Sequence, residues 1–132
     1  MPFEDNEFDL VVSSECIEHS PNPELALKEM CRVISPGGVL ILTTPNKLWY
    51  PVVKLSQVLK LRNFQGNEIF LSRREVRKVV QNSNFMVITH TGCHLFPWHI
   101  PGVKPVLRLI DKQMGYLAPL MINQAIKAQK ID

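Results

Sequence analysis

Apolar residues along the chain form short runs and spaced stripes, the two patterns expected of strands and helices. Residues 8–13 and 39–43 are nearly continuous apolar runs (FDLVVS and VLILT), typical of strands buried on both faces of a parallel sheet. A helical stripe with the spacing i, i+3, i+4 and i+7 lies between them, made of Leu27, Met30, Cys31 and Ile34. This strand–helix–strand order predicts a right-handed βαβ unit and an α/β fold.

The ends of that helix carry their own signals. Asn22, Pro23 and Glu24 supply an N-cap residue, a proline at the first helical position and a carboxylate at the positive end of the helix dipole. Pro36-Gly37-Gly38 predicts the stop of the helix and a turn into the next strand.

The remainder of the chain predicts a looser alternation of helices and strands. Ser72 and Glu75 form a capping box that opens a helix running to about Gln81. No internal repeat, low-complexity run or linker appears, so residues 1–132 are interpreted as one domain. The other expected elements are a helix at 51–61, a loop at 62–70, a strand at 85–91, a connection at 94–105, a helix at 106–116 and an edge-like strand at 122–130.

Composition narrows the function classes without naming one. The net charge of +3 is too mild to indicate a nucleic-acid partner. Three cysteines without a CxxC pair favour a reducing, cytoplasmic location over a disulfide framework. No apolar run reaches 18 residues, so no transmembrane segment is expected, and the acidic amino end does not have the pattern of a signal peptide.

Seven short motifs follow one another over residues 1–46, and their order makes them informative. They are Pro2 to Asn6 (PFEDN), Phe8 to Val12 (FDLVV), Glu18-His19, Leu27, Arg32-Val33, Pro36-Gly37-Gly38 and Thr44-Pro45-Asn46. As an ordered set they resemble the class I S-adenosylmethionine (SAM)-dependent methyltransferases, type 11 group. The resemblance is dense to residue 46 and looser beyond it.

The resemblance implies a partial Rossmann-like sheet with flanking helices. In that family the sheet has seven strands, and this chain resembles strands four to seven, in the order 4-5-7-6 with the last strand antiparallel. Residues 1–132 would then be the C-terminal portion of the domain. The family's glycine-rich cofactor turn is missing, because Gly37-Gly38 follows a predicted helix rather than a strand. A truncated gene product, a misplaced start or an excised fragment is expected over a natural half-domain.

The resemblance also implies where SAM, the expected cofactor, would lie. Ser13, Ser14 and Glu15 would flank its methionine part, and Pro2 and Phe3 would lie near its adenine. Ligands of open α/β sheets bind beyond the carboxyl ends of strands, where residues 13–15 fall. The alternative is that the two serines simply end a strand and satisfy local backbone groups.

A second candidate site consists of Glu15, Glu18 and His19, whose spacing would place them on one face of a helical turn. Two carboxylates and an imidazole can bind a divalent cation, with Mg²⁺ as the expected ion. This ExxEH pattern also resembles that of ubiquinone-pathway O-methyltransferases, where it is associated with a metal. A solvated Glu18 and a locally bonded His19 are favoured over the metal site.

His19 is in addition a candidate general base, since an imidazole can accept the proton of a hydroxyl acceptor before the oxygen attacks a methyl group. The predicted function is SAM-dependent methyl transfer to a small-molecule acceptor, with an oxygen nucleophile suited to His19. The chain alone is expected to bind SAM poorly and to be inactive. The alternative is a non-catalytic half-domain that self-associates through the exposed edge of strand four.

Overall fold

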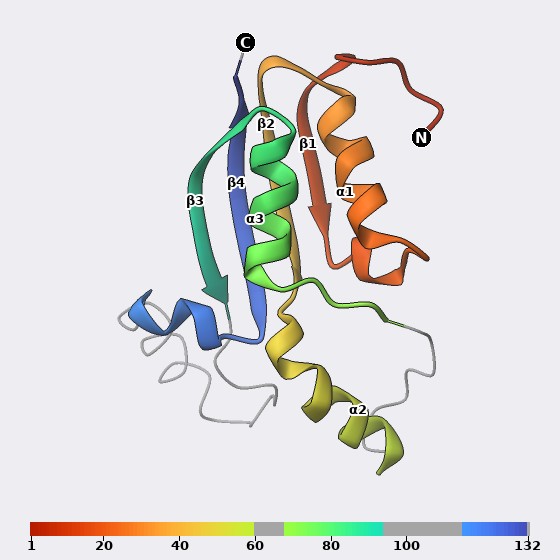
Figure 1. Ribbon diagram of the computed structural model, residues 1–132, viewed down its shortest axis with the longest axis vertical. Coiled ribbons are helices and arrows are strands. Elements are labelled where there is room, and N and C mark those ends of the chain that lie inside the picture. Colours follow the sequence, from red (N-terminus) through yellow and green to blue (C-terminus); the bar gives the residue numbers. More distant parts are fainter. Residues whose placement is uncertain (60–67, 94–114, 132) are drawn as a thin grey trace, which may run out of the picture.

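The computed structural model describes residues 1–59, 68–93 and 115–131. Within this part of the chain, four strands form one mixed sheet, and two helices lie side by side on one of its faces (Figure 1). The strands are β1 (Phe8–Ser14), β2 (Ile34–Pro45), β3 (Phe85–Cys93) and β4 (Asn123–Lys130). The helices are α1 (Pro23–Arg32), α2 (Tyr50–Val58) and α3 (Arg73–Asn82), with 3₁₀ turns η1 (Ile17–His19), η2 (Lys47–Trp49) and η3 (Gly115–Leu120).

The strand order is β1-β2-β4-β3, with β1 parallel to β2 and β4 antiparallel to both of its neighbours. This α/β arrangement agrees with the predicted order of strands and with the antiparallel last strand. The prediction that residues 122–130 form an edge-like strand is wrong. β4 lies between β2 and β3, and its inward side chains Gln124, Ile126 and Ala128 are buried.

The junction between α1 and β2 differs from the sequence prediction. The helix ends at Arg32 and the strand begins at Ile34, so Pro36-Gly37-Gly38 lies inside β2 rather than between helix and strand. Gly37 adopts a positive φ of 76°, and the pairing of β1 with β2 shifts register at this point. The three residues therefore make an irregularity at the amino end of a strand, and Ile34 already belongs to the sheet.

The core lies between the sheet and the two helices α1 and α3 (Figure 1). The predicted helix caps are present: the Asn22 side chain accepts from the Leu25 amide, and Ser72 and Glu75 form the capping box. Of the stripes predicted for the two helices, Met30 is only partly buried, and the other members are buried: Leu27, Cys31, Ile34, Val76, Val79 and Val80. The two helices that the caps and the apolar spacing predict thus bury their apolar sides against this face of the sheet.

The opposite face of the sheet carries exposed apolar side chains. Leu10 is 55% exposed and Val12 61%, so the prediction that β1 is buried on both faces is wrong. Ile41, Met86 and Ile88 on the other strands are also exposed. Described helices cover only the face on which α1 and α3 lie (Figure 1). An apolar run can form a strand with one exposed face, because backbone pairing does not require both faces to be covered.

The remaining predicted elements are partly outside the described residues. α2 confirms the helix predicted at 51–61, although it ends at Val58. Most of the loop predicted at 62–70, the connection at 94–105 and nearly all of the helix at 106–116 lie outside the described residues. None of the described helices is long and apolar enough to span a membrane.

The capping box gives a stability prediction. Replacing Ser72 by alanine should lower the free energy of unfolding by about 1 kcal/mol, because the Glu75 amide loses its acceptor at 3.2 Å. Urea unfolding followed by circular dichroism measures this. The matched control is Ser56→Ala in α2, whose hydroxyl only donates back to the Val53 carbonyl. An equal loss in both variants would contradict a specific role for the cap.

Candidate functional site

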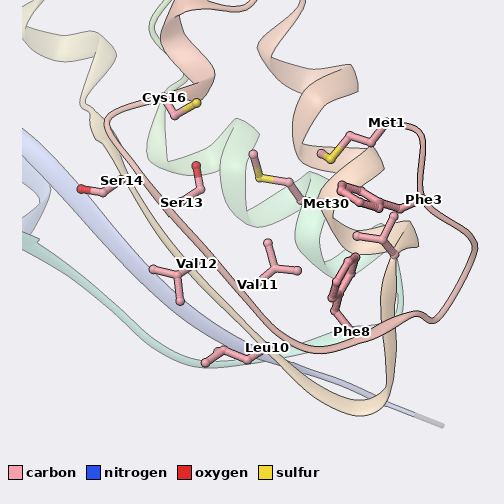
Figure 2. A pocket seen from close by; sticks show the side chains of 11 residues that line it. Met1, Phe3, Phe8, Leu10, Val11, Val12, Ser13, Ser14, Cys16 and Met30 are labelled. Atoms are coloured by element: carbon pink, nitrogen blue, oxygen red, sulfur yellow. The ribbon is translucent and has the colours of Figure 1, made fainter.

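A pocket of about 450 Å³ follows the edge of β1 that no other described strand pairs with (Figure 2). Its polar end lies at the carboxyl end of the strand, and its apolar end lies where the amino-terminal residues cross α1. It is lined by Met1, Phe3, Phe8, Leu10, Val11, Val12, Ser13, Ser14, Cys16, Met30 and Val33. Residues that point to both faces of the sheet take part, so the pocket wraps around the strand edge.

Ser13 supplies a buried polar atom to this pocket. Its side chain points to the same side as Val11 and Met30 (Figure 2), and the residue is only 7% exposed. Its Oγ has no hydrogen-bond partner within the part of the chain that the structure describes. A buried hydroxyl left in this state costs about 1–3 kcal/mol. A bound molecule with a polar atom at this position would remove that cost.

Ser14 points the other way (Figure 2). It has a partner, since its Oγ lies 3.0 Å from Thr43 Oγ1 on β2. Glu15 then leaves the strand with a positive φ of 47°, and its amide donates to the Thr43 carbonyl at 3.0 Å. This contact ends the β1–β2 ladder and turns the chain toward η1. Both serines therefore end a strand, and Ser13 in addition opens onto the pocket.

Three of the five predicted cofactor residues line the pocket: Phe3, Ser13 and Ser14. Pro2 and Glu15 adjoin it in sequence and are not among its lining residues. Cys16 and Met30 also line it, and sequence reasoning missed both. Met30 was assigned to the helix stripe that packs on the core, and a single cysteine in a loop carries no spacing signal.

The structure does not bring Glu15, Glu18 and His19 together as a metal site. Among the described residues, no three His, Cys, Asp or Glu side chains form a group that could hold a metal ion. The helical turn begins only at Ile17, and Glu15 lies before it with a left-handed backbone. The assumption that one helical turn carries all three side chains is therefore wrong, and so is the metal centre built on it.

Glu18 is buried rather than solvated, with 2% exposure. Thr44 Oγ1 donates to its Oε2 at 3.2 Å, and the Ile69 amide donates to its main-chain carbonyl at 2.9 Å. Burial raises the pKa of this carboxyl, with a smaller upward contribution from nearby Glu68. Glu18 thus connects η1 to β2 and to the segment before α3. His19, the next residue, is exposed at the end of the same turn.

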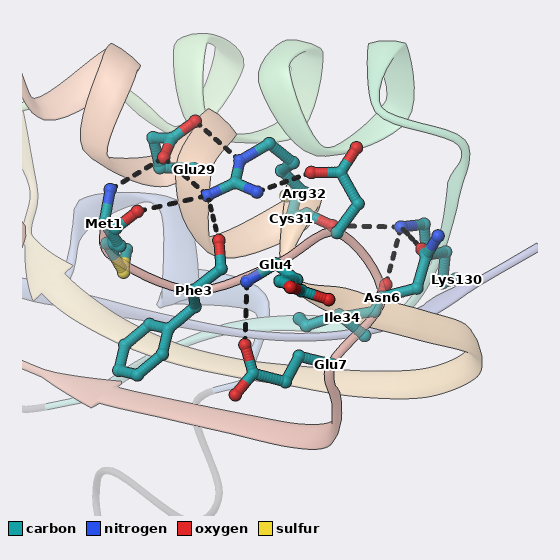
Figure 3. A network of polar contacts seen from close by, with 11 residues as sticks. Met1, Phe3, Glu4, Asn6, Glu7, Glu29, Cys31, Arg32, Ile34 and Lys130 are labelled. Atoms are coloured by element: carbon teal, nitrogen blue, oxygen red, sulfur yellow. Dashed lines mark hydrogen bonds and ion pairs between the residues drawn. The ribbon is translucent and has the colours of Figure 1, made fainter.

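A cluster of polar contacts holds the amino-terminal residues on α1 (Figure 3). Arg32 is its centre: Nη2 donates to the Phe3 carbonyl at 3.0 Å, Nη1 binds Asp5, and Nε donates to Glu29 at 2.9 Å. We call Arg32, Asp5 and Glu29 the Arg32 clamp. A guanidinium presents several donors in a fixed planar arrangement, which suits it to hold two carboxylates and a carbonyl at once.

Lys130 at the end of β4 provides a second anchor for the same segment (Figure 3). Its Nζ donates to Asn6 Oδ1 at 2.8 Å and to the carbonyls of Ile34 and Cys31 at 2.6 and 3.2 Å. Between the two anchors, the ring of Phe3 packs edge-on against Phe8 with a centroid distance of 5.0 Å. The apolar end of the pocket is therefore positioned by charged groups outside it.

The comparisons with known proteins concentrate on the same amino-terminal region. Residues 1–42 match the sequence family described as a methyltransferase domain. A ubiquinone/menaquinone biosynthesis C-methyltransferase UbiE of Laribacter hongkongensis is 42% identical over 66 residues, which are 50% of this chain and 26% of that protein. A demethylmenaquinone methyltransferase of Staphylococcus aureus is 32% identical over 87 residues, 64% of this chain and 36% of that protein.

Over residues 1–42 the chain is therefore similar to methyltransferase domains. The matched segments span about a quarter to a third of these curated relatives. Solved structures share the fold over nearly the whole chain. A SAM-dependent methyltransferase of Thermotoga maritima matches 98% of this chain and 59% of its own length, with a TM-score of 0.65 at 19% identity. Magnesium protoporphyrin IX methyltransferase of Synechocystis, solved with bound SAH, gives a TM-score of 0.58 at 13% identity, covering 98% of this chain and 47% of its own.

The two ends of the pocket differ in polarity. The buried Ser13 hydroxyl offers a polar partner at the carboxyl end of β1, and Phe3, Phe8 and Val33 offer an apolar wall at the other end. No carboxylate lines the pocket within the described residues. Ribose hydroxyls in nucleotide sites are commonly held by Asp or Glu. A nucleotide that is held through its ribose hydroxyls would thus find only part of its usual partners among the described residues.

The Arg32 clamp gives a prediction about the amino-terminal segment. Replacing Arg32 by glutamine should free residues 1–7 from α1 and speed hydrogen exchange of the Asn6 and Phe8 amides, which donate to the main chain at Arg32 and Val33. Mass spectrometry or NMR measures this exchange. Arg74→Gln, an exposed arginine on α3, is the control and should leave those amides unchanged.

The same clamp should respond to pH in a defined direction. The Arg32 guanidinium, together with the terminal amine, lowers the pKa of Glu29 from 4.5 to about 2. Because the folded-state value is the lower one, the contribution of Glu29 is complete above pH 4.5 and is lost as the pH falls toward 2. Exchange at Asn6 that rises over this window in the native chain but not in Arg32→Gln supports the clamp. Parallel behaviour of the two proteins would contradict it.

Proposed function

We propose that this chain forms one wall of the active site of a SAM-dependent methyltransferase that acts on a small-molecule acceptor. The single observation that carries the proposal is the buried Ser13 hydroxyl in the pocket at the carboxyl end of β1, which has no hydrogen-bond partner among the described residues. The match of residues 1–42 to a methyltransferase domain supports SAM as the group that this hydroxyl meets. Residues 1–132 would be the C-terminal portion of the domain, a reading with which the strand order β1-β2-β4-β3 agrees.

Two ends of the pocket would hold two parts of the cofactor. Phe3, braced by Phe8 and held through its carbonyl by Arg32, offers a flat apolar surface to the adenine. Ser13 and Ser14 would lie beside the methionine part, with Glu15 next to them. Pro2 adjoins the adenine end in this proposal. When bound, SAM supplies a methyl group that carries partial positive charge and is transferred to a nucleophile.

We propose that His19 prepares that nucleophile. It is exposed at the end of η1, directly after the buried Glu18 that holds the turn against β2. A neutral imidazole at this place can take the proton of an acceptor hydroxyl, which increases the electron density of the oxygen. In a phenol the same deprotonation activates the neighbouring ring carbons. A phenolic acceptor could therefore be methylated on its oxygen, as expected from His19, or on a ring carbon, as named for the UbiE relative.

The isolated 132-residue chain would bind SAM weakly and transfer methyl groups poorly. Among the described residues, the pocket lies along one open strand edge and has no carboxylate in its lining. The non-catalytic alternative is a module that self-associates through the edge of β1. Exposed Leu10 and Val12 adjoin that edge, and no contact of the described chain favours the module over the enzyme. It stays a prediction.

Titration of the isolated chain with S-adenosylhomocysteine tests the cofactor proposal. Amide NMR signals of Phe3, Ser13 and Ser14 should shift, with a Kd in the millimolar range, because only part of the donor set is present. Ser13→Ala should weaken the shifts, whereas Thr89→Ala, on β3, should not. Micromolar affinity would contradict the predicted weakness, and shifts confined to other residues would contradict the site.

His19 is tested in any preparation that shows methyl transfer. His19→Ala should lower kcat by about 10²- to 10⁴-fold, since a positioned general base contributes on that order. Added imidazole should restore part of the loss. The control is His90→Gln, because His90 lies against Gln124 at 3.0 Å and serves packing between strands. A rate of His19→Ala equal to that of the native protein would remove the base from the mechanism.

A further inference from the structure

The polar end of the pocket carries a thiol as well as the Ser13 hydroxyl. Cys16 and Ser13 both line the pocket, and Figure 2 shows the sulfur and the hydroxyl oxygen at the same end of it. Cys16 stands at the N-cap position of η1, where its side chain makes no capping hydrogen bond, and the residue is exposed. A reagent that enters this end of the pocket from solvent therefore meets a thiol and a hydroxyl together.

The other two cysteines lie in different surroundings. Cys31 is 1% exposed, and burial raises the pKa of its thiol to about 11. A thiol in this state is a poor nucleophile, because the thiolate is the reacting form. Cys93 is half-buried on β3, the strand at the other edge of the described sheet. All three cysteines are free, and only Cys16 combines an exposed thiol with a place in the pocket.

The Ser13 hydroxyl indicates what kind of molecule fits beside the thiol. The residue is 7% exposed and its Oγ has no partner among the described residues, so it can donate to an oxygen that a bound molecule supplies. Val11 and Met30 line the pocket on the same side (Figure 2). A disulfide of an amino acid or short peptide suits this place. Its sulfur atoms pack against apolar side chains, and its carbonyl or carboxylate oxygens accept hydrogen bonds.

We propose that Cys16 is a site of reversible thiol modification, which forms a mixed disulfide with a low-molecular-weight disulfide of an amino acid or short peptide. The Cys16 thiol gives its proton to solvent, and the thiolate attacks one sulfur of the reagent. The new S–S bond forms as the reagent's own S–S bond breaks. The other half leaves with the electron pair as a thiolate, so Cys16 is oxidised and the leaving half is reduced. The attached half lies in the pocket with an oxygen on the Ser13 hydroxyl.

The adduct has a consequence for the cofactor site. It occupies the end of the pocket at which Ser13 and Ser14 would lie beside the methionine part of SAM. The modified chain should therefore bind SAM less well than the reduced chain, and a free thiol should restore binding by releasing the adduct. This competition rests on the proposed function, whereas formation of the adduct needs neither SAM nor an acceptor.

Incubation of the native chain with oxidised glutathione tests the modification in the absence of SAM. Peptide mass mapping over time follows the three cysteines separately. Cys16 should be modified first, Cys93 more slowly, and Cys31 only after unfolding in urea. The amide NMR signals of Val11 and Ser13 should shift as the adduct forms and return on addition of dithiothreitol.

Ser13→Ala should slow the reaction of Cys16 with oxidised glutathione about fivefold, the share of one hydrogen bond. The matched control is dimethyl disulfide, which has no oxygen to accept from Ser13 and should modify Cys16 equally fast in both proteins. Circular dichroism verifies that the variant is folded. Equal rates with oxidised glutathione in the two proteins would overturn the proposal. So would modification of Cys93 before Cys16, or NMR shifts confined to residues outside the pocket.

A titration with S-adenosylhomocysteine separates this proposal from the proposed function. Shifts of Ser13 and Ser14 in the reduced chain that are lost in the modified chain support the competition. Equal shifts in both chains would contradict an adduct that lies in the pocket. Shifts in neither chain would contradict the cofactor site alone, because the fivefold effect of Ser13→Ala on the modification rate is measured without the cofactor.

Discussion

The parallel pairing of β1 with β2 is the contact on which the rest of this structure depends. It requires close approach at Gly38, where a Cβ would lie 2.7 Å from the Ile34 side chain and 3.0 Å from the Asp9 carbonyl. The pairing continues to Ser14 opposite Thr43, and the Glu15 amide closes the ladder. The amino-terminal strand thereby gains a fixed place although it lies at the end of the described sheet.

The position of the pocket follows from this pairing. Parallel strands end at one edge, so the Ser13–Ser14 end of the pocket and the start of α2 lie on the same side of the molecule. At the other end of β1, the Arg32 clamp and Lys130 hold residues 1–6 against α1 and β4 (Figure 3). The pocket is therefore positioned at its two ends by independent sets of contacts.

Much of this could be predicted from local sequence. The βαβ unit, the Asn22 cap, the capping box at Ser72 and the buried stripes depend on neighbours within a few residues, where propensity and spacing are informative. The strand order came from the resemblance of residues 1–46 to a family, because pairing between distant strands leaves little signal in one sequence. The errors arose where the local sequence pattern and the pairing of the segment in the sheet disagree. β4 looks like an edge strand by composition but pairs on both sides, and the Pro36-Gly37-Gly38 motif looks like a helix stop but lies within β2.

The sequence by itself determined the main elements, the caps and the resemblance to a methyltransferase family, since all three rest on the order and spacing of residue types. Only the tertiary structure decided which polar groups meet. It separated Glu15 from Glu18 and His19, because a left-handed residue precedes the turn that was expected to carry all three. It left the Ser13 hydroxyl buried without a partner among the described residues, and it joined Arg32 to Asp5 across 27 positions. Such contacts depend on how the chain folds back on itself. The spacing of residues along the sequence does not encode the distance in space between residues far apart in the chain.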